Sequence, residues 1–116
     1  MATFQKKSFN TPDEKRTPPN VTMEIVSFDG MSAARVAYAA GWRWSEHTRP
    51  VVGTESCQVV HLAYVISGQM AVQMNDGTRL DFRPGDLIIA PPGHDGWVLG
   101  GEPCVMLDFQ GSSRAS

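Results

Sequence analysis

Short runs of apolar and β-branched residues recur along most of the chain, and glycine, proline or asparagine interrupts them at intervals of roughly ten residues. Runs of this kind predict strands rather than helices. Asn75-Asp76-Gly77 predicts a hairpin turn, because glycine accepts the positive φ that such turns need. Residues 31–35 tolerate a helix but are too few to predict one. The expected strands cover residues 21–28, 33–39, 41–47, 57–66, 69–74, 78–82, 86–91, 94–99 and 103–109.

The two ends of the chain differ from this middle. Residues 1–20 are polar, with three prolines and alternating charges, and cannot bury enough apolar surface to offset the entropy of ordering them. We predict a flexible N-terminal arm over residues 1–20, one β domain over residues 21–110 and a linker-like C-terminal tail over residues 111–116. Many short antiparallel strands joined by turns are typical of a β-barrel or sandwich.

Composition removes several classes of function. The chain has 116 residues and a formal net charge of −2, so we expect no nucleic-acid partner. No apolar run approaches the ~20 residues that cross a bilayer, so we expect no membrane span. The N-terminus lacks the apolar region of a signal peptide, which predicts a cytoplasmic protein. Two cysteines are too few for a disulfide scaffold, and that compartment disfavours a Cys57–Cys104 bridge.

The histidines are the main candidates for chemistry. His47, His61 and His94 all fall at predicted strand positions beside turns. His61 shares its strand face with small apolar residues, among which imidazole nitrogens are costly to bury without a partner. Neutral imidazoles that converge from different strands suit a divalent transition metal. The alternative is that a backbone carbonyl satisfies each ring separately.

The spacing around these histidines resembles the two motifs of the cupin superfamily, over roughly residues 35–110. The second motif, in which a glycine is followed after five residues by Pro-x-Gly, is the better matched. The resemblance, closest to a small single-domain subgroup, implies a jelly-roll barrel (a double-stranded β-helix) of two antiparallel sheets. The matching positions are Gly41 and His47, His61 and Gly68, then Gly85, Pro91 and Gly93.

The chain also departs from the cupin pattern. Arg49 stands at the second histidine of the first motif, and His61 stands where the family places its glutamate. Gly96 stands at the last histidine, with His94 two residues earlier and therefore on the same strand face. The resemblance then implies a three-imidazole metal site of His47, His61 and His94. Such a set accepts Zn, Ni, Fe, Mn, Co or Cu and leaves a coordination position open.

Cys57 is a weaker candidate for a fourth ligand. Along a regular strand, residues 57 and 61 lie about 13 Å apart at ~3.3 Å per residue. Donors to one metal lie within ~5 Å of each other. Only a bulge or an earlier strand break would admit Cys57, so we predict that Cys57 and Cys104 are both buried core residues.

Two arginines and two tryptophans surround His47 in the sequence. Arg43 and Arg49 share its predicted strand face and would bind the carboxylate of a ligand at the barrel mouth. Alternatively the strand ends by residue 47, Arg49 is solvated and Arg43 pairs with an acidic residue. Trp42 and Trp44 lie on the opposite face, where the N-terminal arm or a second subunit would have to cover them. Together with the family resemblance, this predicts a homodimer.

These observations predict a small metal-binding cupin that holds one divalent transition metal and binds or converts a small organic molecule. The alternative is a non-catalytic ligand-binding, sensor or accessory barrel that acts through a partner. The incomplete cupin ligand set favours this alternative. A tightly held metal with an open position would favour an enzyme, but the sequence leaves the question of catalysis open.

Overall fold

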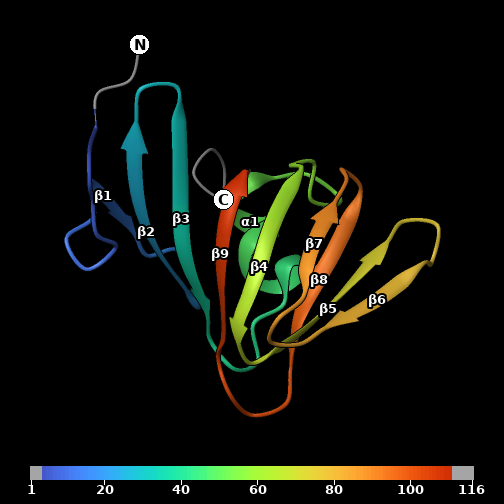
Figure 1. Cartoon of the computed structure of the whole chain (residues 1–116). Helices are drawn as coiled ribbons and strands as arrows, with labels where there is room; N and C mark the ends of the chain where they lie inside the picture. Colours follow the sequence, from blue (N-terminus) through green and yellow to red (C-terminus); the bar gives the residue numbers. More distant parts are fainter. Residues whose placement is uncertain (1–3, 111–116) are drawn as a thin grey trace.

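Nine strands form two antiparallel sheets in the computed structural model, which describes residues 4–110 (Figure 1). The predicted tail, residues 111–116, lies outside the described part. The larger sheet has the order β1 (Glu14–Arg16), β2 (Val21–Phe28), β3 (Met31–Tyr38), β9 (Cys104–Gln110), β4 (His61–Ser67) and β7 (Leu87–Ala90). The smaller sheet has the order β6 (Arg79–Phe82), β5 (Gln69–Met74) and β8 (His94–Leu99).

The core contains the inward-facing residues of both sheets. Burial alternates along β8 and β9, so that every second side chain points inward. Met23, Val36, Val65 and Met106 of the larger sheet belong to one buried cluster with Met70 of the smaller sheet. The all-β prediction is confirmed. The strands expected at 21–28, 69–74 and 94–99 have the predicted bounds.

Part of the predicted N-terminal arm forms a short edge strand, β1. Its β1 pairs antiparallel with β2, and the Asp13 N–H donates to the Ile25 carbonyl at 2.9 Å. Lys7 forms an ion pair with Asp13 at 2.7 Å between Nζ and Oδ2. The arm was predicted because this segment has little apolar surface. An edge strand is instead held by backbone hydrogen bonds, which apolar composition does not report.

The strand predicted at 41–47 is wrong. The chain there forms a π-helical turn, η1 (Trp44–Thr48), followed by one short α-helix, α1 (Arg49–Val52). Pro50 lies in the first turn of α1, where its missing N–H costs no helical hydrogen bond. No helix among residues 4–110 is long and apolar enough to cross a bilayer.

The two tryptophans lie inside the molecule rather than outside it. Arg43 is extended between them, so Trp42 and Trp44 share one face as predicted, but that face is the buried one. Burying two indoles stabilises the fold more than burying the intervening arginine would. Neither the N-terminal segment nor a second subunit is needed to cover them.

Gly68 connects β4 of the larger sheet to β5 of the smaller sheet, and it is the glycine at which the first cupin motif ends. Its φ is +78°, in the left-handed region that favours glycine. A Cβ at this position would lie 2.2 Å from the Pro103 carbonyl oxygen. Only glycine therefore allows the strand that carries His61 to turn here beside the strand connection at Pro103.

Candidate metal centre

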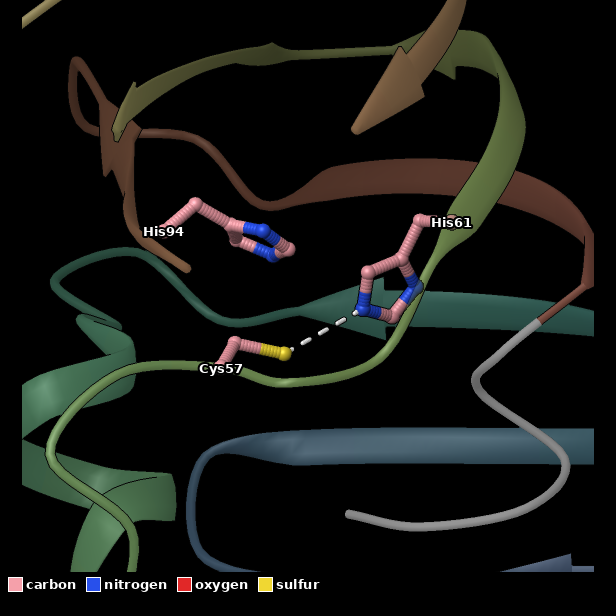
Figure 2. A group of neighbouring side chains, drawn as sticks. All are labelled: Cys57, His61 and His94. Carbon is pink, nitrogen blue, oxygen red and sulfur yellow. Dashed lines mark hydrogen bonds between the residues drawn. The ribbon is translucent and has the colours of Figure 1, made fainter. Parts of the chain in front are cut away.

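Cys57, His61 and His94 converge from three separate segments (Figure 2). His61 is the first residue of β4, and His94 is the first residue of β8. Cys57 precedes β4 and is held by the backbone: its N–H donates to the His94 carbonyl at 2.8 Å, and its carbonyl accepts from the Gly93 N–H at 2.7 Å. This isolated bridge fixes the thiol beside the start of β8.

The separations within this cluster fit a single metal ion. The donor atoms of the three side chains all lie within 4.8 Å of one another. Cys57 Sγ is 3.6 Å from His61 Nε2. A tetrahedral ion with metal–sulfur and metal–nitrogen bonds of ~2.3 and ~2.0 Å separates such a pair of donors by about 3.5 Å. The sulfur and the nitrogen therefore already stand at the distance that a shared ion requires.

Hydrogen bonds orient both imidazoles through their far nitrogens. His94 Nδ1 lies 2.6 Å from the Pro91 carbonyl oxygen, which only accepts, so Nδ1 donates this hydrogen bond and Nε2 is the nitrogen left for a metal. His61 Nδ1 lies 2.9 Å from Oδ2 of Asp108, a carboxylate buried on the inner face of β9. A hydrogen bond from the far nitrogen to a carbonyl or carboxylate is usual for a metal-binding histidine.

The same contacts shift the pKa values of the thiol and of one imidazole. Burial raises the pKa of Cys57, but hydrogen bonds with His61 and His94 outweigh burial, and the net pKa falls to about 6. Burial lowers the pKa of His61, but Asp108 and Cys57 outweigh burial, and the net pKa rises to about 9. The two shifts favour a thiolate on Cys57 beside an imidazolium on His61. A metal ion would replace the proton between the two side chains.

A cavity of about 50 Å³ adjoins the three donors. Its other walls come from both sheets and from the segment around η1, and most of them are apolar. These walls include Tyr38, Trp42, Trp44, Met70, Val72 and Met106. Asp108 also lines the cavity, but its carboxylate already bonds to His61. A metal held by the three donors would thus face a small, mostly apolar space.

The sequence model of a family described as EutQ-like cupin domain matches residues 33–104. The chain belongs to this family. No curated protein matches the sequence.

Solved structures support the same fold for this EutQ-like cupin. A Rhizobium leguminosarum protein of unknown function has a TM-score of 0.67 at 19% identity, with 93% of this chain and 96% of that chain covered. The polyketide cyclase RemF from Streptomyces resistomycificus has a TM-score of 0.65 at 17% identity, with 94% and 80% covered. Oxalate decarboxylase from Lactobacillus farciminis has a TM-score of 0.66 at 17% identity, with 98% and 35% covered. These identities show a shared fold only.

Of the three histidines expected to share a metal, the structure brings His61 and His94 together and places His47 elsewhere. His47 lies in η1, and its Nδ1 accepts from the backbone N–H of Arg43 at 3.0 Å. The reason is local: the chain forms a helical turn at Trp44–Thr48, so the alternation of strand faces that predicts the direction of His47 does not continue to that residue.

The two arginines expected to bind a ligand have protein partners. Arg43 lies over the ring of Trp97, 4.2 Å from its centroid, and 3.4 Å from a carboxylate oxygen of Asp95. Arg49 forms an ion pair with Glu55 at 2.8 Å. Neither arginine is among the described residues that line the cavity.

Cys57 is a buried core residue, as predicted. The strand expected from residue 57 begins only at His61, so the earlier strand break that would admit Cys57 to the site is present. Asp108 was missed altogether. The signal for it was an acidic residue at an inward-facing position of an apolar strand, two residues after Met106.

Proposed function

We propose that this EutQ-like cupin binds one divalent transition metal through Cys57, His61 and His94, inside a jelly-roll barrel formed by its two sheets. The observation that carries the proposal is the convergence of three donors whose imidazoles are both oriented by hydrogen bonds at the far nitrogen. One thiolate and two imidazoles suit Zn, Fe, Co, Ni or Cu better than Mn, which prefers oxygen ligands.

Three protein ligands leave one tetrahedral position for a small organic molecule in the adjoining cavity. When bound, the metal would supply Lewis-acid or redox chemistry there. The protein's own residues orient the donors and shape the cavity: Asp108 and the Pro91 carbonyl hold the imidazoles, and the tryptophans and methionines give the cavity an apolar wall.

Metal analysis of tag-free protein purified without chelator tests this proposal. We expect about one transition metal per chain in the wild type, and loss of that metal in His61→Ala and His94→Ala. His47→Ala is the matched control, because its imidazole bonds within its own helical turn and should leave the metal content unchanged.

Two results would contradict the proposal. One is a wild-type protein without metal even after reconstitution with zinc, iron, cobalt, nickel and copper. The other is a metal content that falls in His47→Ala but persists in His61→Ala, which would move the site toward η1.

A second candidate, a ligand-binding barrel without catalysis, is favoured by the composition of the cavity wall. Outside the donor cluster and Asp108, Tyr38 carries the single ionisable group among the described lining residues. A site with few groups able to transfer protons suits binding better than acid–base chemistry. If this candidate holds, protein stripped of metal by a chelator should keep its affinity for a small ligand. If the function depends on the metal, the same treatment should lower that affinity.

We also propose that the protein is a homodimer, through the outward face of β4, β7 and β9. Exposed apolar side chains gather there across paired strands, and Tyr64 lies opposite Leu87 in the register. Contiguous exposed apolar surface commonly marks an interface. Ile89→Lys on edge strand β7 should yield monomers in sedimentation equilibrium. Leu80→Lys on the other sheet, an equally exposed position, should not.

A cytoplasmic location completes the proposal. Both cysteines are unpaired, which fits a reducing compartment. Oxidation of Cys57 would remove a metal ligand, so the proposed site requires such an environment. Fractionation of the native host with an antibody against the chain tests this point, and recovery from the periplasmic or secreted fraction would contradict it.

A further inference from the structure

Trp44 carries a buried hydrogen-bond donor that nothing in the described residues satisfies. Its indole lines the cavity and is 4% exposed. Among the described residues, its Nε1 is the single buried side-chain nitrogen or oxygen without a hydrogen-bond partner. Trp42, two residues earlier and lining the same cavity, differs: its Nε1 donates to Thr48 Oγ1 at 3.2 Å.

An orphaned N–H beside a cavity indicates a bound acceptor. Buried polar groups in native proteins are almost always hydrogen-bonded, and one left unsatisfied is destabilising. The fold provides an internal acceptor for Trp42 and none for Trp44. Since Trp44 lines the cavity next to the donor cluster, a molecule bound in this cavity is a suitable acceptor for its N–H.

The charges around the cavity favour a neutral molecule over an anion. No lysine or arginine is among the described lining residues, and the two nearby arginines have partners outside the cavity. The lining already contains the carboxylate of Asp108. An anionic ligand would therefore add a negative charge where the described lining residues offer no lysine or arginine to balance it.

The size and lining of the cavity limit the ligand further. A volume of about 50 Å³ holds only a few water-sized groups. The walls outside the cluster are mostly aromatic rings, methionines and aliphatic side chains. A short apolar body with one acceptor oxygen fits these walls, because the body contacts apolar surface and the oxygen reaches the indole N–H.

We propose that Trp44 is the ligand-recognition residue of this cavity, and that it donates its indole N–H to the oxygen of a small neutral carbonyl compound. The proposal rests on the proposed function, because the ligand would occupy the cavity beside the metal. It adds the chemical class of the ligand and assigns a role to a tryptophan that does not ligate the metal.

Three probes of nearly identical shape test the inference: acetone, which is a neutral acceptor; acetate, which is an anion; and isobutene, which has no oxygen. Each is titrated into ¹⁵N-labelled, zinc-treated protein while the three indole N–H resonances are followed by NMR. Acetone should shift the Trp44 resonance and leave that of Trp42 nearly in place. Trp44→Phe should weaken acetone binding roughly fivefold to tenfold, and isobutene binding less than twofold.

Trp42→Phe is the matched control, because it removes an indole N–H that already has a partner in the protein. It should change acetone binding less than Trp44→Phe does. The wild-type shift of the Trp44 resonance needs no variant, so the proposal stays testable if Trp44→Phe fails to fold.

The zinc content of the same samples separates this inference from the proposed function. If the wild type holds zinc and acetone leaves the Trp44 resonance unmoved, the inference is wrong and the metal site stands. If acetone binding depends on Trp44 in protein that takes up none of zinc, iron, cobalt, nickel and copper, the recognition role stands and the metal site is wrong. A dependence on Trp44 as strong for acetate as for acetone would overturn the assignment of a neutral ligand.

Discussion

Cys57 and Cys104 are equally buried, at 2% and 0% exposure, yet they lie in opposite chemical surroundings. Burial alone raises the pKa of Cys104 to about 11. Burial also raises the pKa of Cys57, but the histidine neighbours lower it to about 6. The same residue type in one small core is therefore an unreactive packing residue at position 104 and an acidic thiol at position 57.

This comparison shows where the chemistry of the fold arises. Cys104 is the first residue of β9, and burial is the one cause that shifts its pKa. Cys57 stands before a strand begins, where its backbone bonds to the start of a second strand and brings the thiol toward two imidazoles. Reactive character follows from the junction of segments rather than from depth in the core.

The largest expected difference between the two cysteines is in their titration. In metal-free protein, the ultraviolet absorbance of the Cys57 thiolate, measured as the difference between wild type and Cys57→Ser, should titrate with a midpoint near pH 6. Cys104→Ser should remove no thiolate signal below pH 9, because burial raises the pKa of that thiol. His61→Gln should move the Cys57 midpoint upward, since it removes a lowering contact. Equal midpoints for both thiols would contradict the difference between their surroundings.

Metal affinity should separate the cysteines next. Competition with a chromogenic chelator should show that Cys57→Ser weakens zinc binding by more than the ~10–100-fold typical of losing a group that only supports a ligand. Cys104→Ser should leave zinc affinity unchanged, although it introduces a hydroxyl into apolar surroundings and costs about 1–3 kcal/mol of unfolding free energy. Zinc affinity unaffected by Cys57→Ser would remove the thiolate from the site.

Asp108 should have a smaller effect on the metal, because it acts through His61. Asp108→Asn keeps the shape but weakens the acceptor for His61 Nδ1–H, so zinc affinity should fall ~10–100-fold in the same competition assay. Asp95→Asn is the matched control, since Asp95 accepts from the backbone N–H groups of Ser45 and Gly96, away from the donors. Equal effects from both variants would indicate general destabilisation instead of support for a ligand.

The smallest effect is expected in the pH dependence of metal-free stability. The raised pKa of His61 gives stability that is present below pH 6.5 and lost as the pH rises through about 9. The lowered pKa of Cys57 gives stability that is present above pH 9 and lost as the pH falls through about 6. Between about pH 6.5 and 9 the contributions of His61 and Cys57 to the pH dependence of the unfolding free energy cancel, because folding moves a proton from the thiol to the imidazole.

Chemical denaturation at several pH values measures this cancellation. The wild type should show little change attributable to the pair between pH 6.5 and 9. In Cys57→Ser the thiol no longer offsets the pH dependence that His61 gives to the unfolding free energy. This free energy should therefore decrease with rising pH by up to ~1.4 kcal/mol per pH unit. A wild type with the same slope as Cys57→Ser would show that the thiol is not ionised in the folded protein.

The sequence predicts most strands correctly because alternation and turn residues agree along them. In residues 69–74 the apolar residues Met70, Val72 and Met74 recur at every second position between Gly68 and the Asn75-Asp76-Gly77 turn, and β5 has those bounds. His61 and His94 were found in the same way, since each begins an alternating strand and faces inward from it.

Prediction failed where the chain turns without a strong local signal. The apolar run before His61 looks like a continuous strand in the sequence, so the break that brings Cys57 to His61 was not evident. Trp42 and Trp44 alternate as in a strand, but the chain coils immediately afterwards and carries His47 away from the donors. Both features depend on packing between distant segments, which local periodicity does not encode.

X-ray absorption at the zinc edge of reconstituted protein tests the central claim most directly. We predict a first coordination shell with one sulfur at ~2.3 Å and two imidazole nitrogens at ~2.0–2.1 Å, and loss of the sulfur contribution in Cys57→Ser. A shell of nitrogen and oxygen alone in the wild type, or a spectrum that Cys57→Ser leaves unchanged, would contradict a metal centre built from Cys57, His61 and His94.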